Sequence, residues 1–290
     1  MNKIQIKLTR DYMQSLLQRC IDEDGGFHGD VTTHSIVSKE LKNRFTIHVR
    51  GKGTIAGLDA IADSLDVFEG LSMELLHHDG DQVQDEGIAI VEGPMQMILV
   101  AERTLLNILG HASGIATLTR QFVEAVSSTH CEVCDTRKTT PGLRVLEKYA
   151  VTCGGGTLHR LGLHDAALYK DNHVSHLEDY SSQLGCAIES IQSKQSLSFI
   201  DVEVDTIEQL EQVLLMPVDI VLLDNMTNEQ LTHAVSMRDS CVNSPLLEAS
   251  GGVTLDSIRE IAETGVDRIA VGALTHQARW LDIGLDAINE

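Results

Sequence analysis

The sequence predicts a mixed α/β protein in which an N-terminal α+β sandwich domain precedes an incomplete α/β barrel. Three observations lead to this prediction. Residues 45–49 alternate apolar and polar side chains, which is typical of a half-buried strand. After residue 130, short apolar runs recur roughly every 20–25 residues with helix-like segments between them, which indicates a parallel sheet. These later runs are apolar almost throughout, as expected of strands that are buried on both faces.

The composition fits an ordinary globular protein. The chain has 290 residues, of which 42% are hydrophobic and 22% are charged, so it can bury one large core or two smaller ones. No apolar run approaches the roughly 18 residues of a membrane span, and the N-terminus does not resemble a signal peptide. We therefore expect a cytoplasmic protein. The formal net charge of −21 argues against a nucleic-acid partner, which would require a basic face.

The N-terminal elements follow from the spacing of apolar residues. Residues 11–24 are spaced like the buried face of a helix, and Asp30, Thr32 and Thr33 after it are interpreted as a turn or helix cap. In chain order we then expect the strand at 45–49 to continue through 51–57, a helix at 59–68, strands at 73–83 and 87–99, and a helix at 100–127 that is interrupted near 110–114. The domain boundary is placed at this interruption, which gives domains 1–110 and 111–276.

The barrel strands are expected at short apolar runs in the second half of the chain. The runs are 131–135, 166–170, 199–204, 219–224, 245–250 and 268–273. Consecutive right-handed strand–helix units of this kind close naturally toward a barrel. Residues 280–288 alternate apolar and polar positions instead, so residues 277–290 are expected to return to the N-terminal domain as a half-buried strand.

Positive charge is concentrated in the segment Asp135–His173. Its cations are Arg137, Lys138, Arg144, Lys148, Arg160 and Lys170, with His159 and His173 beside them. From residue 171 to 267 the permanent cations are Lys194, Arg238 and Arg259. A strongly acidic chain that gathers its positive charge in one segment is expected to form a pocket for an anion.

The carboxyl ends of the expected barrel strands carry polar residues, and functional groups of such barrels collect there. Glu203 and Asp224 end neighbouring strands, where carboxylates suit sugar hydroxyls or Mg²⁺, although each could simply cap the next helix. Glycine pairs follow the last two strands and favour a phosphate site; the residues concerned are Ser250, Gly251, Gly252, Gly272 and Ala273. Opposite them, a cationic wall suited to carboxylates is expected from Arg137, His159, Arg160 and Lys170. The pattern thus predicts a barrel enzyme that joins or splits a phosphosugar and an acid.

Two other features have simpler interpretations on pattern alone. Cys131 and Cys134 form a CxxC, but residues three apart on a strand face opposite sides, so we interpret both as reduced structural thiols. Arg103, next to Glu102, has the pattern of a solvated charge on a helix.

Several long motifs resemble one enzyme family. They are GDVTT, AERTLLNILGHASGIATLTR, DTRKTTPGLRVLEKYAV, GGGTLHRLGLHDAALYKDNH, VEVDTIEQL, LLDN, EASGGVT and ETGVDRIAVGALTH. Together they cover nearly the whole chain and are similar to quinolinate phosphoribosyltransferases, also called carboxylating nicotinate-nucleotide pyrophosphorylases. The resemblance implies a glycosyltransferase (pentosyltransferase) of NAD biosynthesis. Such an enzyme converts quinolinate and phosphoribosyl pyrophosphate, with Mg²⁺, to nicotinate mononucleotide, pyrophosphate and CO₂. It also implies a homodimer or larger homo-oligomer with shared active sites.

The resemblance also assigns residue roles, motif by motif. Quinolinate is expected to contact Arg103 of the neighbouring subunit, Arg137, His159, Arg160 and Lys170. Phosphoribosyl pyrophosphate is expected to contact Thr136, Lys138, Glu203, Asp224, Ser250, Gly251, Gly252, Val271, Gly272 and Ala273. Lys138, Glu203 and Asp224 are the catalytic candidates, and the pyrophosphate is expected to hold most of the Mg²⁺ coordination. Thr152, Leu158 and Tyr169 depart from the common bacterial pattern without removing any of these charged residues.

Three alternatives remain open at this point. One is a paralogous pyrophosphorylase-like protein associated with molybdenum transport, which shares much of the motif set. Another is a Schiff-base aldolase-type lyase that uses Lys170 as its nucleophile, which requires a desolvated lysine. The last is a barrel without catalytic activity, which the many charges at strand ends disfavour.

Overall fold

The structure is a computed structural model that describes residues 4–26, 29–194 and 196–288. The chain forms two compact units. The first unit holds the described residues up to Gln5, Gln121–Thr139 and Gly156–His276, and the second holds Ile6–Arg120, Thr140–Gly155 and the C-terminal segment from Gln277. The chain therefore passes from one unit to the other several times.

The first unit is built on a six-stranded parallel sheet with the strand order β6-β11-β10-β9-β8-β7. The strands are β6 (Glu132–Cys134), β7 (Ala167–Tyr169), β8 (Ile200–Val204), β9 (Ile220–Asp224), β10 (Leu246–Ser250) and β11 (Arg268–Ala270). Within the described residues no ladder joins β6 to β7, so the sheet stays open between its edge strands. The prediction of an incomplete barrel with α/β alternation is confirmed.

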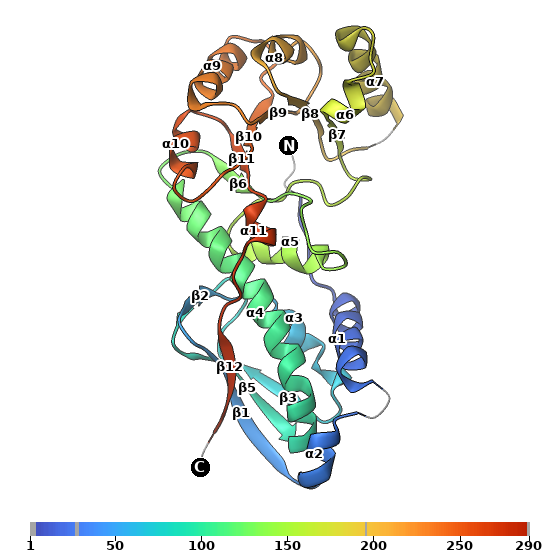
Figure 1. Cartoon of the computed structure of the whole chain (residues 1–290), viewed down its shortest axis with the longest axis vertical. Helices are drawn as coiled ribbons and strands as arrows, with labels where there is room; N and C mark the ends of the chain where they lie inside the picture. The colour runs from blue at the N-terminus through green and yellow to red at the C-terminus, as the bar shows by residue number, and fades with distance from the viewer. Residues whose placement is uncertain (1–3, 27–28, 195, 289–290) are drawn as a thin grey trace. The chain divides into compact units, whose positions relative to one another are not determined.

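Helices follow the strands β7 to β11 of this sheet. They are α6 (Asp171–Val174), α7 (Tyr180–Lys194), α8 (Ile207–Val213), α9 (Asn228–Asp239), α10 (Ile258–Glu263) and α11 (Ala273–His276). Helices α8, α9 and α10 lie along the outside of the sheet (Figure 1). Local sequence specifies where they begin. Thr206 and Thr227 each accept a hydrogen bond from the backbone N–H three residues later, while the glutamine at that position bonds back to the cap.

The second unit contains a four-stranded antiparallel sheet with the order β12-β1-β5-β3 and a separate pair, β2 and β4. The strands are β1 (Lys42–Val49), β2 (Lys52–Thr54), β3 (Ser72–Leu75), β4 (Gln82–Gln84), β5 (Gly87–Pro94) and β12 (Ile283–Ala287). The helices are α1 (Arg10–Gly25), α2 (Val31–Ile36), α3 (Leu58–Asp63), the 3₁₀ turn η1 (Leu65–Val67), the N-terminal part of α4 (Met95–Ala125) and α5 (Arg144–Cys153).

The C-terminal strand β12 pairs antiparallel with β1, from Phe45 opposite Ala287 to Val49 opposite Ile283 (Figure 1). The alternation seen in the sequence buries Phe45, Ile47 and Val49 on one face of β1. The interpretation of Asp30 is also confirmed. Its carboxylate caps α2 by accepting hydrogen bonds from the backbone N–H groups of Thr32 and Thr33, at 3.0 and 2.9 Å.

Two predictions about residues 87–127 are wrong. The strand expected over 87–99 ends at Pro94, and Met95–Leu99 begin α4 instead. Ile98, Ala101 and Leu105 are buried at the three- and four-residue spacing of one helical face. The strand prediction assigned the first of these residues to a different element, so this spacing was not recognised. The interruption expected near 110–114 is absent, since α4 continues through Gly110 and Gly114.

These two glycines have a packing role that local propensity does not reveal. A Cβ atom on Gly110 would lie 3.0 Å from the carbonyl oxygen of Leu281, and one on Gly114 would lie 2.2 Å from that of Arg279. The segment before β12 therefore packs directly against the backbone of α4. The glycines cost helix propensity, but they allow this close approach.

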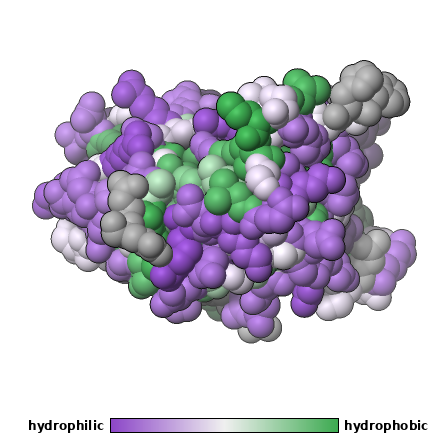
Figure 2. All heavy atoms as spheres, turned by 90° about the horizontal axis from the view of Figure 1, so that it is seen from below, coloured by the Kyte–Doolittle hydropathy of each residue, from purple (hydrophilic) through white to green (hydrophobic). Residues whose placement is uncertain are grey.

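Some apolar side chains of the second unit remain exposed, including Val31, Ile36, Leu41 and Leu76. Figure 2 shows an apolar area surrounded by polar atoms on the face seen from below. Helix α4 has 31 residues, yet within the described parts of the chain no helix combines the length and apolar character that crossing a bilayer requires.

The packing of Gly114 gives a stability prediction. The substitution Gly114→Ala places a methyl group where the Arg279 carbonyl lies, so we expect the free energy of unfolding to fall by about 1–3 kcal/mol. Thermal or urea unfolding measures this loss. The control is Gly185→Ala in α7, where a Cβ meets nothing within 4 Å and alanine improves helix propensity by about 1 kcal/mol. Equal stability of the two variants would contradict the proposed packing.

Candidate active site

A cavity of about 510 Å³ lies at the carboxyl ends of the barrel strands, and all of its lining belongs to the first unit. The lining residues come from strands β7, β9, β10 and β11, from the loops after β6, β7, β9 and β10, and from the segment that follows α5. They are Thr136, Arg137, Lys138, His159, Arg160, Leu168, Lys170, Leu222, Asp224, Asn225, Glu248, Ser250, Gly251, Gly252 and Ala270. The cavity thus brings together most of the residues that the sequence singled out.

The cationic side of the cavity is assembled around Asp135, which is fully buried directly after β6. Its carboxylate accepts a hydrogen bond of 2.8 Å from the backbone N–H of His159. Thr157, two residues earlier, forms an isolated parallel bridge with Cys134. These contacts join the loop after β6 to the segment that carries His159 and Arg160.

Arg137 and Arg160 form an electrostatically unfavourable pair in the absence of an anion. Arg160 is only 7% exposed, and its pKa is lowered first by burial and then by the positive charge of Arg137. The Nε atom of Arg137 is buried and has no hydrogen-bond partner among the described residues. A carboxylate bound between two such guanidinium groups would accept forked hydrogen bonds and relieve their repulsion.

Lys170 follows β7 and pairs with Glu203 of β8. The Lys170 side chain is 40% exposed, whereas the Glu203 side chain is only 9% exposed. Lys170 lines the cavity, and Glu203 is linked to the cavity by its ion pair with Lys170. This partly solvated, ion-paired position differs from the desolvated environment that a nucleophilic lysine requires, and it suits an anion contact.

The cavity also carries hydroxyl, carboxylate and backbone groups. Asp224 ends β9, and Ser250 ends β10 with Gly251 and Gly252 after it. Lys138 lies in the loop after β6, where its N–H donates to Thr136 Oγ1 at 3.0 Å and its carbonyl accepts from Thr275 Oγ1 at 2.7 Å. Three further predicted residues follow β11: Val271, whose N–H donates to the Cys134 carbonyl at 2.8 Å, then Gly272 and Ala273, which begins α11.

A buried charged network joins two lining residues of the cavity, His159 and Glu248, to Asp201 and Arg268, and it was not predicted from the sequence. His159 Nε2 lies 3.3 Å from Asp201 Oδ2 and 3.4 Å from Glu248 Oε1, and Arg268 Nε donates to Glu248 Oε2 at 2.7 Å. Burial raises the pKa of Asp201 to about 6. Burial disfavours the charged imidazole, but the carboxylates of Glu248 and Asp201 outweigh that effect and raise the pKa of His159. The Arg160 N–H donates to His159 Nδ1 at 2.8 Å, so the ring orientation is fixed from both edges.

One oxygen or nitrogen atom from each of His159, Asp201 and Glu248 lies within 4.8 Å of the others, which is a spacing that a metal ion could use. Arg268 already supplies positive charge to Glu248 from a position only 3% exposed. A cation between these groups would be repelled by that guanidinium. We therefore interpret the network as structural support for His159 and not as a metal centre.

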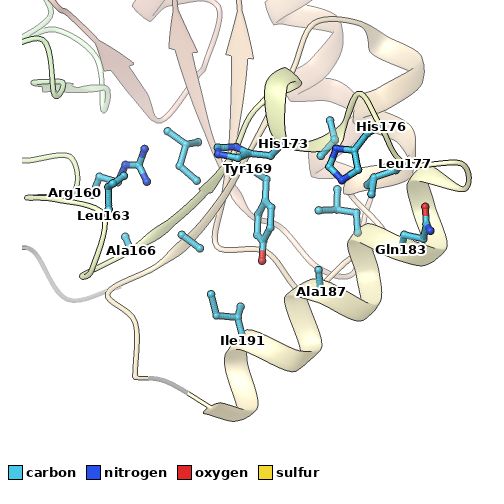
Figure 3. A pocket seen from close by; sticks show the side chains of 14 residues that line it. Arg160, Leu163, Ala166, Tyr169, His173, His176, Leu177, Gln183, Ala187 and Ile191 are labelled. Atoms are coloured by element: carbon cyan, nitrogen blue, oxygen red, sulfur yellow. The ribbon is translucent and has the colours of Figure 1, made fainter.

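A second cavity, of about 420 Å³, lies between β7 and α7 (Figure 3). Its lining is largely apolar. Tyr169 points toward Ala187 and Ile191 of α7, and Arg160 lines this cavity as well as the first. The departure of Tyr169 from the common bacterial pattern therefore involves the packing of α7 and not the charged cavity.

The remaining predicted residues lie elsewhere. Arg103 is an exposed residue of α4 in the second unit. Cys131 and Cys134 are buried free thiols, and burial raises the pKa of Cys131 to about 12, in agreement with a structural role. Asn225, Asp201, Glu248 and Arg268 were missed. For Asp201, Glu248 and Arg268, the sequence did offer one signal of a buried polar network: each is a charged residue in an otherwise apolar strand.

An open α/β barrel with an arginine pair and a glycine-lined edge at its strand ends defines a class of proteins that bind small anionic molecules. Comparison with known proteins identifies the family within this class. The sequence matches "Quinolinate phosphoribosyl transferase, N-terminal domain" over residues 30–113 and the C-terminal domain of the same family over residues 115–286. The chain therefore belongs to the quinolinate phosphoribosyl transferase family.

Individual relatives agree with this assignment. The chain is 40% identical to the carboxylating nicotinate-nucleotide pyrophosphorylase of Mycobacterium leprae, over 95% of this chain and 97% of the relative. It is 34% identical to quinolinate phosphoribosyltransferase [decarboxylating] 1b of Nicotiana tabacum, over 96% of this chain and 83% of the relative. The solved nicotinate-nucleotide pyrophosphorylase of Francisella tularensis superimposes with a TM-score of 0.90 at 33% identity, covering 99% of this chain and all of that one.

The buried network gives a second stability prediction. Replacing Arg268 by Met leaves Glu248 buried without its cation, so we expect unfolding to become easier by about 3–5 kcal/mol. The matched control is Arg259→Met, which removes an exposed pair with Glu263 and should change stability by less than about 1 kcal/mol. Urea unfolding of both variants makes the comparison. A loss at Arg268 no larger than at Arg259 would show that the network does not stabilise the barrel.

Proposed function

We propose that this chain transfers the phosphoribosyl group of phosphoribosyl pyrophosphate to quinolinate and releases pyrophosphate and CO₂, forming nicotinate mononucleotide. The observation that carries the proposal is the arginine pair, Arg137 and Arg160, in the same cavity as Asp224 and the Ser250–Gly252 turn. One side of this cavity suits a dicarboxylate, and the other suits a ribose phosphate. The family assignment and the names of its relatives support the same reaction.

Each side of the cavity has a binding role in this proposal. Arg137, Arg160 and Lys170 hold the two carboxylates of quinolinate, and His159 supports the wall that they form. The phosphoribosyl pyrophosphate lies against Thr136, Lys138, Asp224, Ser250, Gly251, Gly252, Val271, Gly272 and Ala273, with Glu203 behind Lys170. Fixed carboxylates orient the ring nitrogen toward the anomeric carbon, which removes much of the entropic cost of bringing the two reactants together.

In this proposal the reaction takes place in two bond-breaking steps. The bond from the anomeric carbon to the pyrophosphate oxygen breaks, and the ring nitrogen forms the new bond. Positive charge that develops at the anomeric carbon is stabilised by the carboxylate of Asp224 and, at longer range, by that of Glu203 behind Lys170, and Lys138 stabilises the departing pyrophosphate. The ring C–CO₂⁻ bond then breaks and leaves its electron pair on the ring carbon beside the cationic nitrogen. A proton from solvent completes the product.

Mg²⁺ is the cofactor that this reaction implies. Hard oxygen donors suit it, and the carboxylate of Asp224, which lines the cavity, fits this requirement together with Glu203 on the adjacent strand. We propose that the pyrophosphate holds most of the coordination and that these two carboxylates supply any protein oxygens. The ion would neutralise charge on the leaving group.

The competing functions receive less support. A Schiff-base mechanism needs Lys170 uncharged, whereas Lys170 is partly solvated and paired with Glu203. A paralogous pyrophosphorylase associated with molybdenum transport would share the barrel, so the acceptor assay below is the test between the two. Two expectations from the sequence remain predictions. One is the division into an N-terminal domain, 1–110 with 277–290 returning to it, and a barrel domain, 111–276. The other is the cytoplasmic location.

The central test is turnover with quinolinate, phosphoribosyl pyrophosphate and Mg²⁺, run beside nicotinate as the alternative acceptor. We expect product and CO₂ only with quinolinate. Arg160→Ala should lower the turnover rate by about a hundredfold or more, because one carboxylate loses its forked contact. Arg259→Ala serves as an exposed-arginine control with unchanged rates. Near-normal turnover by a folded Arg160→Ala protein would refute the assigned role.

Sharing of active sites between subunits gives a separate prediction. We propose that Arg103 contacts quinolinate in the neighbouring subunit of a homodimer or larger assembly. Arg103→Ala and Arg160→Ala should each be inactive alone, yet mixed dimers regain one intact site. Random mixing should restore about a quarter of the wild-type rate. If unfolded and refolded mixtures stay inactive while mixed oligomers form, Arg103 acts within its own subunit.

A further inference from the structure

Asn225 is a residue of the cavity with an unusual backbone conformation. It follows β9 directly and has a φ of 54°, in the left-handed region. Among the described residues, Asp85 is the other non-glycine residue with positive φ. Asparagine tolerates this region better than most residues but still adopts it at some cost. Such conformations persist where surrounding contacts impose them, and they cluster at functional sites.

The contacts of Asn225 connect two strand ends of the cavity. Its backbone N–H donates to the carbonyl of Ser250 at 2.8 Å, which ties the loop after β9 to the end of β10. Its side-chain Nδ2 donates to Asp224 Oδ2 at 2.7 Å. The amide therefore holds one oxygen of the Asp224 carboxylate and leaves the other oxygen available.

Gly251, which follows the neighbouring strand β10, lies directly against the side chain of Asn225. A Cβ atom at Gly251 would lie 2.1 Å from Asn225 Oδ1 and 2.7 Å from Cγ. The amide thus lies directly against the Gly251 backbone, and Gly251 itself has a φ of 109°. A side chain at residue 251 would displace the amide from Asp224, so the two residues are sterically matched.

We propose that Asn225 is a positioning residue that fixes the orientation of the Asp224 carboxylate toward the ribose hydroxyls of phosphoribosyl pyrophosphate. This inference rests on the proposed function, in which Asp224 contacts that substrate. The neutral amide orients the carboxylate without neutralising its charge.

A purely structural role for Asn225 predicts a different outcome from substitution. If the residue serves only to allow the left-handed turn, glycine should replace it without loss, since glycine adopts positive φ freely. If the amide orients Asp224, glycine keeps the turn but removes the hydrogen bond. Asn225→Gly therefore separates the two roles.

The experiment measures the Kd of phosphoribosyl pyrophosphate by calorimetry, together with KM and kcat. For Asn225→Gly we expect the Kd and KM of phosphoribosyl pyrophosphate to rise about tenfold or more, as for loss of a hydrogen bond to a charged group, with quinolinate affinity unchanged. In an Asp224→Ala background the same substitution should have no further effect on Kd, because the group it orients is gone. Asp85→Gly is the matched control for replacing a left-handed residue, and it should leave both affinities unchanged.

The outcomes distinguish this inference from the function on which it rests. Wild-type affinity of Asn225→Gly for phosphoribosyl pyrophosphate, or an equal loss with and without Asp224, would overturn the positioning role while the enzyme remains active. A wild-type protein that neither binds phosphoribosyl pyrophosphate nor turns over quinolinate would instead overturn the proposed function.

Discussion

The hydrogen bond from the His159 N–H to the buried Asp135 carboxylate is the constraint on which the cationic wall depends. It fastens the segment after α5 to the loop after β6 and so holds Arg160 next to Arg137. Two guanidinium groups do not approach each other in a barrel interior unless the backbone compels them. The charge of Arg137 contributes to the lowered pKa of Arg160, so an anion bound between the two side chains would relieve an unfavourable interaction that the fold imposes.

The same interior contains both acidic and basic groups, and depth decides their roles. Asp201, Glu248 and Arg268 are at most 3% exposed, and there Glu248 pairs with Arg268 while both carboxylates contact His159. Asp224 and Lys170 lie at the strand ends, where solvent reaches them. A chain with a net charge of −21 repels anionic substrates at long range, so the local cluster has to act at short range inside a walled pocket.

Much of the architecture could be read from the sequence, because alternating strand and helix patterns and strand-end charges have direct physical meaning. Charge alone suggested that all cations of the segment Asp135–His173 contribute to one anion pocket, but their positions in the fold divide them. Arg144 and Lys148 resemble Arg160 in the sequence but lie on α5, which belongs to the other compact unit, and Lys148 is fully buried there. The uninterrupted course of α4 could not be predicted, since Gly110 faces a segment about 170 residues later in the chain. Asn225 escaped notice because only its dihedral angle distinguishes it from an ordinary turn residue.

The pairing of β1 with β12 has a consequence for how the protein is made. During synthesis β1 appears early, pairs with β5 on one side, and keeps a row of unpaired N–H and C=O groups on the other until residues 283–287 emerge. The second unit, to which β1 belongs, is thus completed last, after every barrel strand has left the ribosome. In the interval its open edge is a template for pairing with another nascent chain, and the final five-residue strand is the element that closes it.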